Sequence, residues 1–410
     1  MIRRSVVVLC RGRYRQERRA GLGLAQFAGL RDSTVRHGRS NTSYAANCST
    51  DIGPELRKGS TVRRVFIIGV VVLSGCAAGP QPSRAAARQC PLTESDSRWT
   101  QDVLDNWARA SRDYLAIDPD PLPRIVLFDS ACVWHLGTEA SDAPGSDRPD
   151  TPLRFAGRPV PVQARPHDGT VMLPNGARIP AEIIAVAMPG SAGQDAFFVL
   201  ALPQLWRRHP QASQDPHLAI RIPSVALHEM IHTRQMSHLQ RRVQAIRQRF
   251  DLPARFDDDV VEDRFGDSAE YRRLFVAELE LLYDAVSESD RDRCIALASE
   301  ALSIAQKRRE RFFTGNDEVY AELEGLFLNM EGVAEWVRFK SHQADAAWPN
   351  GDADIIAFLR GQENSWSQDE GLALVLLLDR MVPDWKRQII SPAMPSPWTI
   401  LREAIYGARE

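Results

Sequence analysis

The stretch Val225-Ala-Leu-His-Glu-Met-Ile-His-Thr-Arg-Gln235 decides how this chain folds and what it can bind. It contains the pattern His-Glu-x-x-His, with His228 and His232 four residues apart. Residues at this spacing lie on one face of an α-helix, so both imidazoles can bind one zinc ion. Glu229, beside them, can take a proton from a zinc-bound water. The sequence therefore predicts a zinc site with Glu229 as its general base.

The flanks of the motif predict a helix over residues 223–249. Pro223 and Ser224 are typical of helix starts. Apolar residues recur at helical spacing beside the His/Glu face, at Leu227, Met230 and Ile231.

The composition is that of a globular protein. The chain has 410 residues, 44% of them apolar and 25% charged, which is enough for one large domain or two smaller ones. The net charge of −2 gives no bulk attraction to nucleic acid, so we expect no nucleic-acid partner.

The first part of the chain predicts export. Residues 1–61 are rich in Arg and Ser, and we interpret them as a disordered leader or a gene-model extension. Residues 62–75 combine basic residues with a short apolar run, which is typical of a signal peptide. The run ends in Leu73-Ser-Gly-Cys76, which resembles a bacterial lipobox. This resemblance implies lipidation of Cys76 and membrane attachment.

The expected location is therefore the bacterial cell envelope, lipid-anchored at the periplasmic face of the outer membrane. Residues 76–95 are interpreted as a tether, since their first part is rich in Ala, Gly, Pro and Ser. In an exported protein Cys90 and Cys132 could form a disulfide, which would leave Cys294 free, but sequence does not fix that pairing.

The fold class predicted is α+β, a small N-terminal sheet followed by a large, mostly helical, zincin-like domain. Residues 96–205 form an α/β subdomain, with a helix at 96–116, a loop at 138–152 and strands at 124–128, 132–136, 183–188 and 196–202, plus a hairpin around Pro174-Asn-Gly176. Residues 206–410 form a helical catalytic subdomain, with helices near 223–249, 268–288, 290–313, 317–341, 352–360, 367–380 and 396–407. The acidic loop from Asp257 to Asp263 is interpreted as solvated charge.

Two histidines leave a catalytic zinc one protein ligand short. Glu331 is the preferred third ligand, because it lies at the edge of the apolar stripe of the helix 317–341 and can point into an interface. The neighbouring Gly332 is a poor helix residue, which indicates close approach of another helix.

His238 is the competing third ligand, since the chain is one residue away from the metzincin pattern HExxHxxGxxH. Gln235 stands where that pattern has the helix-breaking Gly. On an unbroken helix His238 faces away from His232, roughly 240° around the axis. Glu278 and Glu280 are held in reserve as helix acids.

His228, Glu229, His232 and the downstream Glu331-Gly-Val-Ala-Glu-Trp336 resemble the gluzincin metallopeptidases, in which the third ligand lies in an EGxAxY-type helix. Gly371-Leu-Ala-Leu, Asp379 and Trp385 resemble a helix that follows the ligand in such proteins. The resemblance implies zinc bound by His228, His232 and Glu331. Two features depart from the pattern: Trp336 replaces the usual Tyr, and the gap between His232 and Glu331 is long.

The function expected is zinc-dependent peptide-bond hydrolysis on a peptide or protein substrate. The strand at 197–202 could offer an edge to an extended peptide. Candidates for the oxyanion donor are Tyr320, Tyr283, His238 and Arg234. Two alternatives stay open, a non-catalytic envelope lipoprotein scaffold and a metzincin-like peptidase that uses His238.

Overall fold

The computed structural model describes residues 90–137, 152–190, 195–253, 256–344, 348–360 and 366–407. The expected leader, signal peptide and lipidated Cys76 lie outside these residues, as does nearly all of the loop predicted at 138–152. Within the described residues, no helix has both the length and the apolar character needed to cross a bilayer.

The N-terminal half is built on a five-stranded sheet of order β5-β2-β1-β9-β8. Its strands are β1 (Arg124–Phe128), β2 (Cys132–Leu136), β5 (Val162–Pro166), β8 (Ala185–Met188) and β9 (Phe197–Ala201). β1 and β9 run parallel, and the other neighbours are antiparallel. Two short hairpins join β3 (Arg154–Phe155) to β4 (Arg158–Pro159) and β6 (Thr170–Met172) to β7 (Arg178–Pro180).

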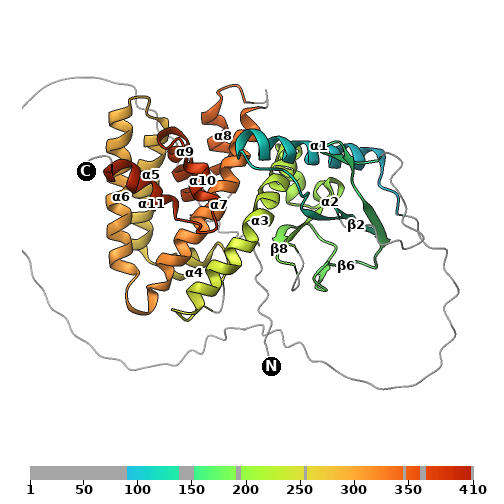
Figure 1. The fold of residues 1–410 in the computed structure, drawn as a ribbon, viewed down its shortest axis with the longest axis horizontal. Helices are drawn as coiled ribbons and strands as arrows, with labels where there is room; N and C mark the ends of the chain where they lie inside the picture. The colour runs from blue at the N-terminus through green and yellow to red at the C-terminus, as the bar shows by residue number, and fades with distance from the viewer. Residues whose placement is uncertain are drawn as a thin grey trace, which may run out of the picture. The chain divides into compact units, whose positions relative to one another are not determined.

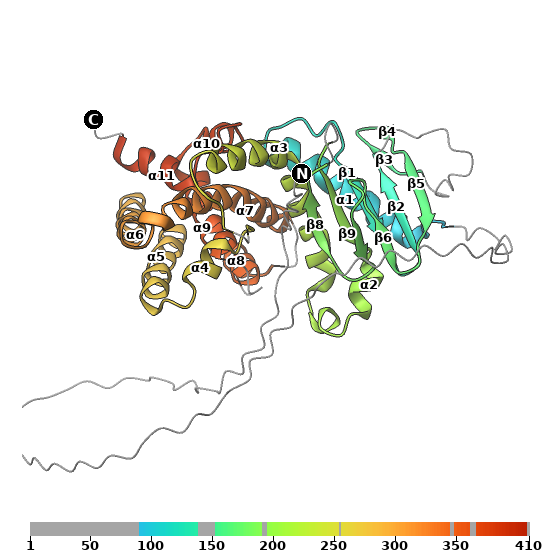
Figure 2. The ribbon, with the colours of Figure 1, turned by 90° about the horizontal axis from the view of Figure 1, so that it is seen from below.

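The order of the strands corrects one expectation. The strand predicted at 197–202 is β9, which lies between β1 and β8 and so has no free edge. Such an interior position fits its sequence, since all five residues of β9 are apolar and buried. The free edge on this side of the sheet belongs to β8, and Figure 2 shows β8 as the strand nearest the helical half.

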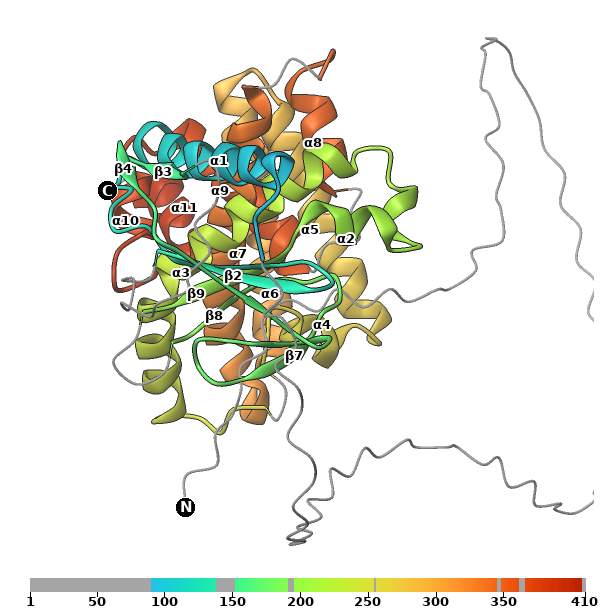
Figure 3. The same ribbon diagram turned by 90° about the vertical axis from the view of Figure 1, so that its right-hand side faces the viewer.

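A helix lies across one face of the sheet (Figures 1 and 3). This is α1 (Glu94–Arg109), which continues into a π-helical turn at Ala110–Tyr114. Its first turn is capped by Thr93, whose hydroxyl accepts the backbone N–H of Asp96. Just before α1, Cys90 forms a disulfide with Cys132 at the start of β2, and Cys294 is a free, buried thiol.

The helix that carries the His-Glu-x-x-His motif is α3 (Leu218–Arg247), and it contacts β8 and β9 on one side and α7 on the other. It starts five residues before the predicted position, so Pro223 lies inside it. Pro223 has no N–H to donate to the carbonyl four residues earlier, so this turn of α3 lacks one backbone hydrogen bond. The short helix α2 (Pro203–Arg208) and a 3₁₀ turn (Ala212–Gln214) lead into α3.

The described residues after α3 are mostly helical, as predicted. Its helices are α4 (Val260–Phe265), α5 (Ala269–Ser287), α6 (Arg291–Phe312), α7 (Val319–Gln343), α8 (Asp352–Arg360), α9 (Trp366–Met381), α10 (Trp385–Ile389) and α11 (Pro397–Tyr406). α7 is buried along almost its whole length, between α3 and α9. Figure 1 shows α5 and α6 on the side of α7 that faces away from α3.

A buried arginine joins four of these helices. Arg308 of α6 has no exposed surface, and its guanidinium donates to Glu278 of α5 at 2.8 and 2.9 Å and to Glu324 of α7 at 2.5 Å. Glu370 of α9 lies 3.6 Å away. The reserve candidate Glu278 is therefore an ion-pair residue, while Glu280 is exposed.

α7 and α9 cross at a pair of glycines. A Cβ atom added to Gly332 would lie 2.6 Å from the carbonyl oxygen of Gly371, inside any tolerable contact. The two backbones therefore touch at this point, which confirms the close approach predicted from Gly332.

We expect Gly332→Ala to lower the free energy of unfolding by about 1–3 kcal/mol, because the added methyl meets backbone that cannot rotate away. Gly325→Ala is the matched control on the same helix, where the new Cβ meets the side chain of Ser396 at 3.1 Å. Both substitutions gain the same helix propensity, so urea denaturation of the two variants isolates the clash. Equal stability of the two variants would contradict the crossing described here.

Candidate metal centre

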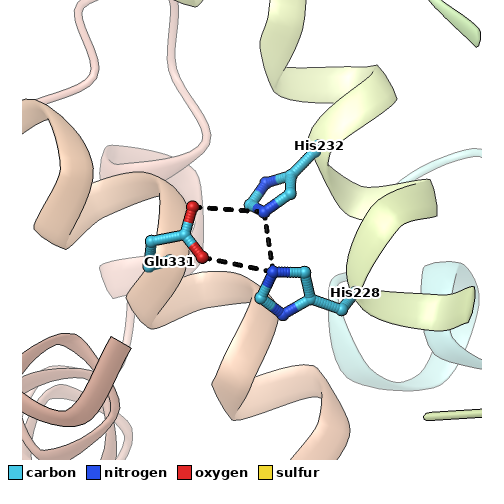
Figure 4. A group of neighbouring side chains, drawn as sticks. All are labelled: His228, His232 and Glu331. Carbon is cyan, nitrogen blue, oxygen red and sulfur yellow. Dashed lines mark hydrogen bonds and ion pairs between the residues drawn. The ribbon is translucent and has the colours of Figure 1, made fainter. Parts of the chain in front are cut away.

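α3 and α7 bring the three predicted ligands together at their interface. His228, His232 and Glu331 form a buried cluster whose ligand atoms lie within 4.8 Å of one another. Figure 4 shows both imidazoles of α3 pointing at the carboxylate of α7. Nε2 of His228 lies 3.2 Å from Oε2 of Glu331, and Nε2 of His232 lies 3.3 Å from Oε1. The sequence argument from the apolar stripe therefore places Glu331 correctly in space.

The distances within the cluster are near those expected between ligands of one metal ion. Ligand atoms about 2.0–2.1 Å from a tetrahedral zinc lie roughly 3.3 Å from each other. The two His–Glu separations are close to this value but join different oxygens of Glu331, and the Nε2–Nε2 separation of His228 and His232, 2.8 Å, is shorter.

The hydrogen bonds behind the rings fix which nitrogen faces the cluster. Nδ1 of His232 lies 2.9 Å from the amide oxygen of Gln235, whose NH₂ group donates to the carbonyl of Met330. An amide oxygen only accepts, so Nδ1 must carry the proton and the neutral ring presents the lone pair of Nε2. Gln235 thus orients His232 and links α3 to α7.

His228 is oriented by a second acid. Its Nδ1 lies 3.0 Å from Oε1 of Glu335, a close contact without good hydrogen-bond alignment. Glu335 is held in turn by Arg338, at 2.7 and 3.0 Å, and Arg338 also reaches the hydroxyl of Ser224. Such outer partners fix ring orientation and raise ligand basicity in metal sites. Sequence reasoning missed Glu335, although it follows Glu331 by four residues and so shares its helix face.

The cluster has the electrostatics of a cation site. Burial alone would lower the pKa of His228, but Glu331 and Glu335 outweigh it and raise the pKa to about 10. Burial likewise would raise the pKa of Glu331, but the two imidazoles hold it well below its ordinary value. Without a metal, the site therefore retains a proton as its cation.

The predicted base lies beside the cluster but makes a different contact. Oε2 of Glu229 accepts the backbone N–H of Ala187, in strand β8, at 2.7 Å. Burial raises the pKa of Glu229, and the neighbouring imidazoles partly offset this. Burial thus moves the pKa of Glu229 toward neutral pH, the direction a general base requires.

One predicted surface feature is buried at this site. Asp258, in the acidic loop expected to be solvated, is only 7% exposed. Burial, together with the negative charge of Glu331, raises its pKa well above the ordinary value. The loop carrying it contacts α9, where the hydroxyl of Ser367 donates to the carbonyl of Asp258. The acidic sequence of this loop did not predict that Asp258 is buried.

The other candidates lie elsewhere. His238 lines a small apolar cavity with Ile231 and Leu115 and contacts Arg241, as expected for a residue that faces away from His232. The remaining oxyanion candidates are engaged in other contacts: Tyr283 donates to Asp369, Tyr320 packs on Phe265, and Arg234 donates to backbone carbonyls at 118–121. Trp336 packs edge-on against Trp385 in the core.

Comparison of the chain with protein-family models, curated proteins and solved structures found no match.

We expect the metal-free protein to lose stability as pH rises from about 7 to 10. A histidine whose folded pKa is raised stabilises the protein fully below its unfolded value, about 6.5, and this stabilisation is lost as pH passes the folded value. The folded pKa of His228 is about 10, so the loss of stability falls in this window.

Urea unfolding in the presence of a chelator, repeated across this pH range, measures the loss of stability. Zinc should abolish the dependence by replacing the proton, and His228→Asn should reduce it. A metal-free protein that is equally stable at about pH 7 and about pH 10 would contradict the raised pKa of His228.

Proposed function

We propose that this protein is a zinc-dependent peptidase of gluzincin type. The observation that carries the proposal is the convergence of two Nε2 atoms and one carboxylate in a buried cluster, with a second carboxylate beside it. His228, His232 and Glu331 would hold the ion. When bound, zinc would polarise the scissile carbonyl and lower the pKa of a bound water.

The protein's own groups would supply the proton transfers. Glu229 would accept a proton from water and pass it to the leaving amine, since burial keeps its pKa above the ordinary value. Glu335 and Gln235 would hold the two imidazoles in the tautomer that leaves Nε2 unprotonated.

The free edge of β8 supports an extended peptide as substrate. Val186 pairs with Val199 of β9, and alternation along the strand turns the N–H of Ala187 away from β9. An extended chain could add to this edge through backbone hydrogen bonds. The N–H of Ala187 now meets the carboxylate of Glu229, so substrate binding would require this contact to open.

Burial of the site supports a second candidate, a scaffold with structural zinc. His232 and Glu331 have no exposed surface, and His228 is only 4% exposed. Closed sites are typical of structural zinc, whereas catalytic zinc keeps a position open. The peptidase therefore requires the elements around the cluster to open for a substrate, and the scaffold does not.

We also propose an exported, lipid-anchored protein of the bacterial envelope. The Cys90–Cys132 disulfide supports export, because disulfides persist mainly in oxidising compartments. The lipobox-like Cys76 lies outside the described residues and supports the anchor from sequence alone.

We expect Glu229→Gln to lower peptide hydrolysis by about 100- to 10,000-fold while zinc content stays unchanged. The amide oxygen can still accept the N–H of Ala187, so the fold should survive. Glu280→Gln, an exposed acid of α5, is the matched control and should retain full activity. Activity on a casein and peptide panel and metal content by mass spectrometry give the two readouts. A wild-type protein that holds zinc but hydrolyses nothing would favour the scaffold.

A further inference from the structure

A glutamine from α9 reaches the predicted ligand carboxylate. The side-chain amide of Gln368 donates to Oε2 of Glu331 at 3.3 Å. We infer that Gln368 is a positioning residue that fixes which oxygen of Glu331 faces the ion, an inference that rests on the proposed metal site. No sequence motif pointed to Gln368.

The two oxygens of Glu331 have different surroundings. Each oxygen faces one imidazole, Oε2 at 3.2 Å from Nε2 of His228 and Oε1 at 3.3 Å from Nε2 of His232. Only Oε2 also accepts the amide of Gln368, whereas Oε1 is buried and has no hydrogen-bond donor. A buried acceptor without a donor is unfavourable, so the site must compensate it in another way. Because Oε1 also lies 3.3 Å from Nε2 of His232, a cation between the ligands would compensate it. Oε1 is therefore the oxygen left for the metal.

The chemistry of the contact requires an amide at position 368. A carboxylate that binds a metal must be deprotonated, and a deprotonated carboxylate only accepts hydrogen bonds. Gln368 must then turn its NH₂ group to Oε2, which supplies a donor without adding charge. A glutamate here would bring a second anion against the first.

The glycine crossing explains how α9 delivers this amide. Gln368 lies one helical turn before Gly371, whose backbone touches Gly332. Gly332 directly follows Glu331, so the contact between the helices places the first turn of α9 over the carboxylate. The close crossing and the glutamine act together on one ligand.

The functional consequence is a ligand that binds through one oxygen. A catalytic zinc needs three protein ligands and one open position. With Oε2 held by Gln368, Glu331 would contribute Oε1 alone. Without the amide of Gln368, Oε2 of Glu331 would be free to turn to the ion and to occupy the open position.

The test compares Gln368→Met with wild type, using Zn²⁺ and Co²⁺ as probes. Methionine keeps the length and helix propensity of glutamine but cannot donate. We expect zinc affinity to fall about 10- to 100-fold, the usual effect of losing an outer partner. We also expect the visible absorption of the Co²⁺ form to weaken, because added coordination lowers it. The matched control is Gln306→Met, which removes a similar Gln–Glu contact, 2.7 Å to Glu310 on the exposed face of α6. This control should change neither the zinc affinity nor the absorption of the Co²⁺ form.

The possible outcomes separate this inference from the proposed function. If wild type binds zinc and Gln368→Met matches it in affinity and Co²⁺ spectrum, the inference is overturned and the metal site stands. If wild type binds no zinc, the metal site fails and the inference with it. Should Gln368→Met fail to fold, Gln368→Leu provides the second variant, because it also removes the donor without adding charge and should weaken zinc binding in the same direction.

Discussion

The structure depends on a requirement for positive charge between α3 and α7. Nε2 of His228 and Nε2 of His232 lie 2.8 Å apart, and each faces the carboxylate of Glu331. Glu331 is fully buried, so two neutral rings would leave its carboxylate as a buried anion without a countercharge. Buried groups of this kind are tolerated only when they are paired. A cation, either a proton or a metal ion, is therefore part of the packing between the two helices.

The charge around this cation is held by contacts between helices. Arg338 balances Glu335 one turn along α7, and Gln235 ties α3 to the backbone of α7 through Met330. Two turns before Glu331, Glu324 is fixed by the buried Arg308. α7 is thus anchored at both ends of its central stretch. Breaking one partner of a buried ion pair typically costs several kcal/mol, so the register of α7 is well determined.

Sequence reasoning found the parts of the site that lie within single helices. The spacing of His228 and His232 and the edge position of Glu331 follow from helical periodicity, which is local. Gly332 also predicted a close helix contact, but its partner Gly371 could not be named. The free edge of β8, the burial of Asp258 and the contact of Gln368 depend on pairing between distant segments, and no pattern in one sequence encodes that. Glu335 could have been found from its four-residue spacing to Glu331.

Whether burial excludes catalysis is a question of magnitude. One contact beside the cluster on the sheet side is the hydrogen bond from the N–H of Ala187 in β8 to Glu229 in α3. A hydrogen bond to a charged group contributes about 1.5–3 kcal/mol, equivalent to roughly a 10- to 150-fold preference for keeping that contact. An extended peptide on β8 would return a backbone acceptor to Ala187 and recover much of that cost. This one hydrogen bond is therefore weak enough for an extended peptide to replace it, while the packing of α3 against β8, β9 and α7 is a separate constraint on opening the cluster.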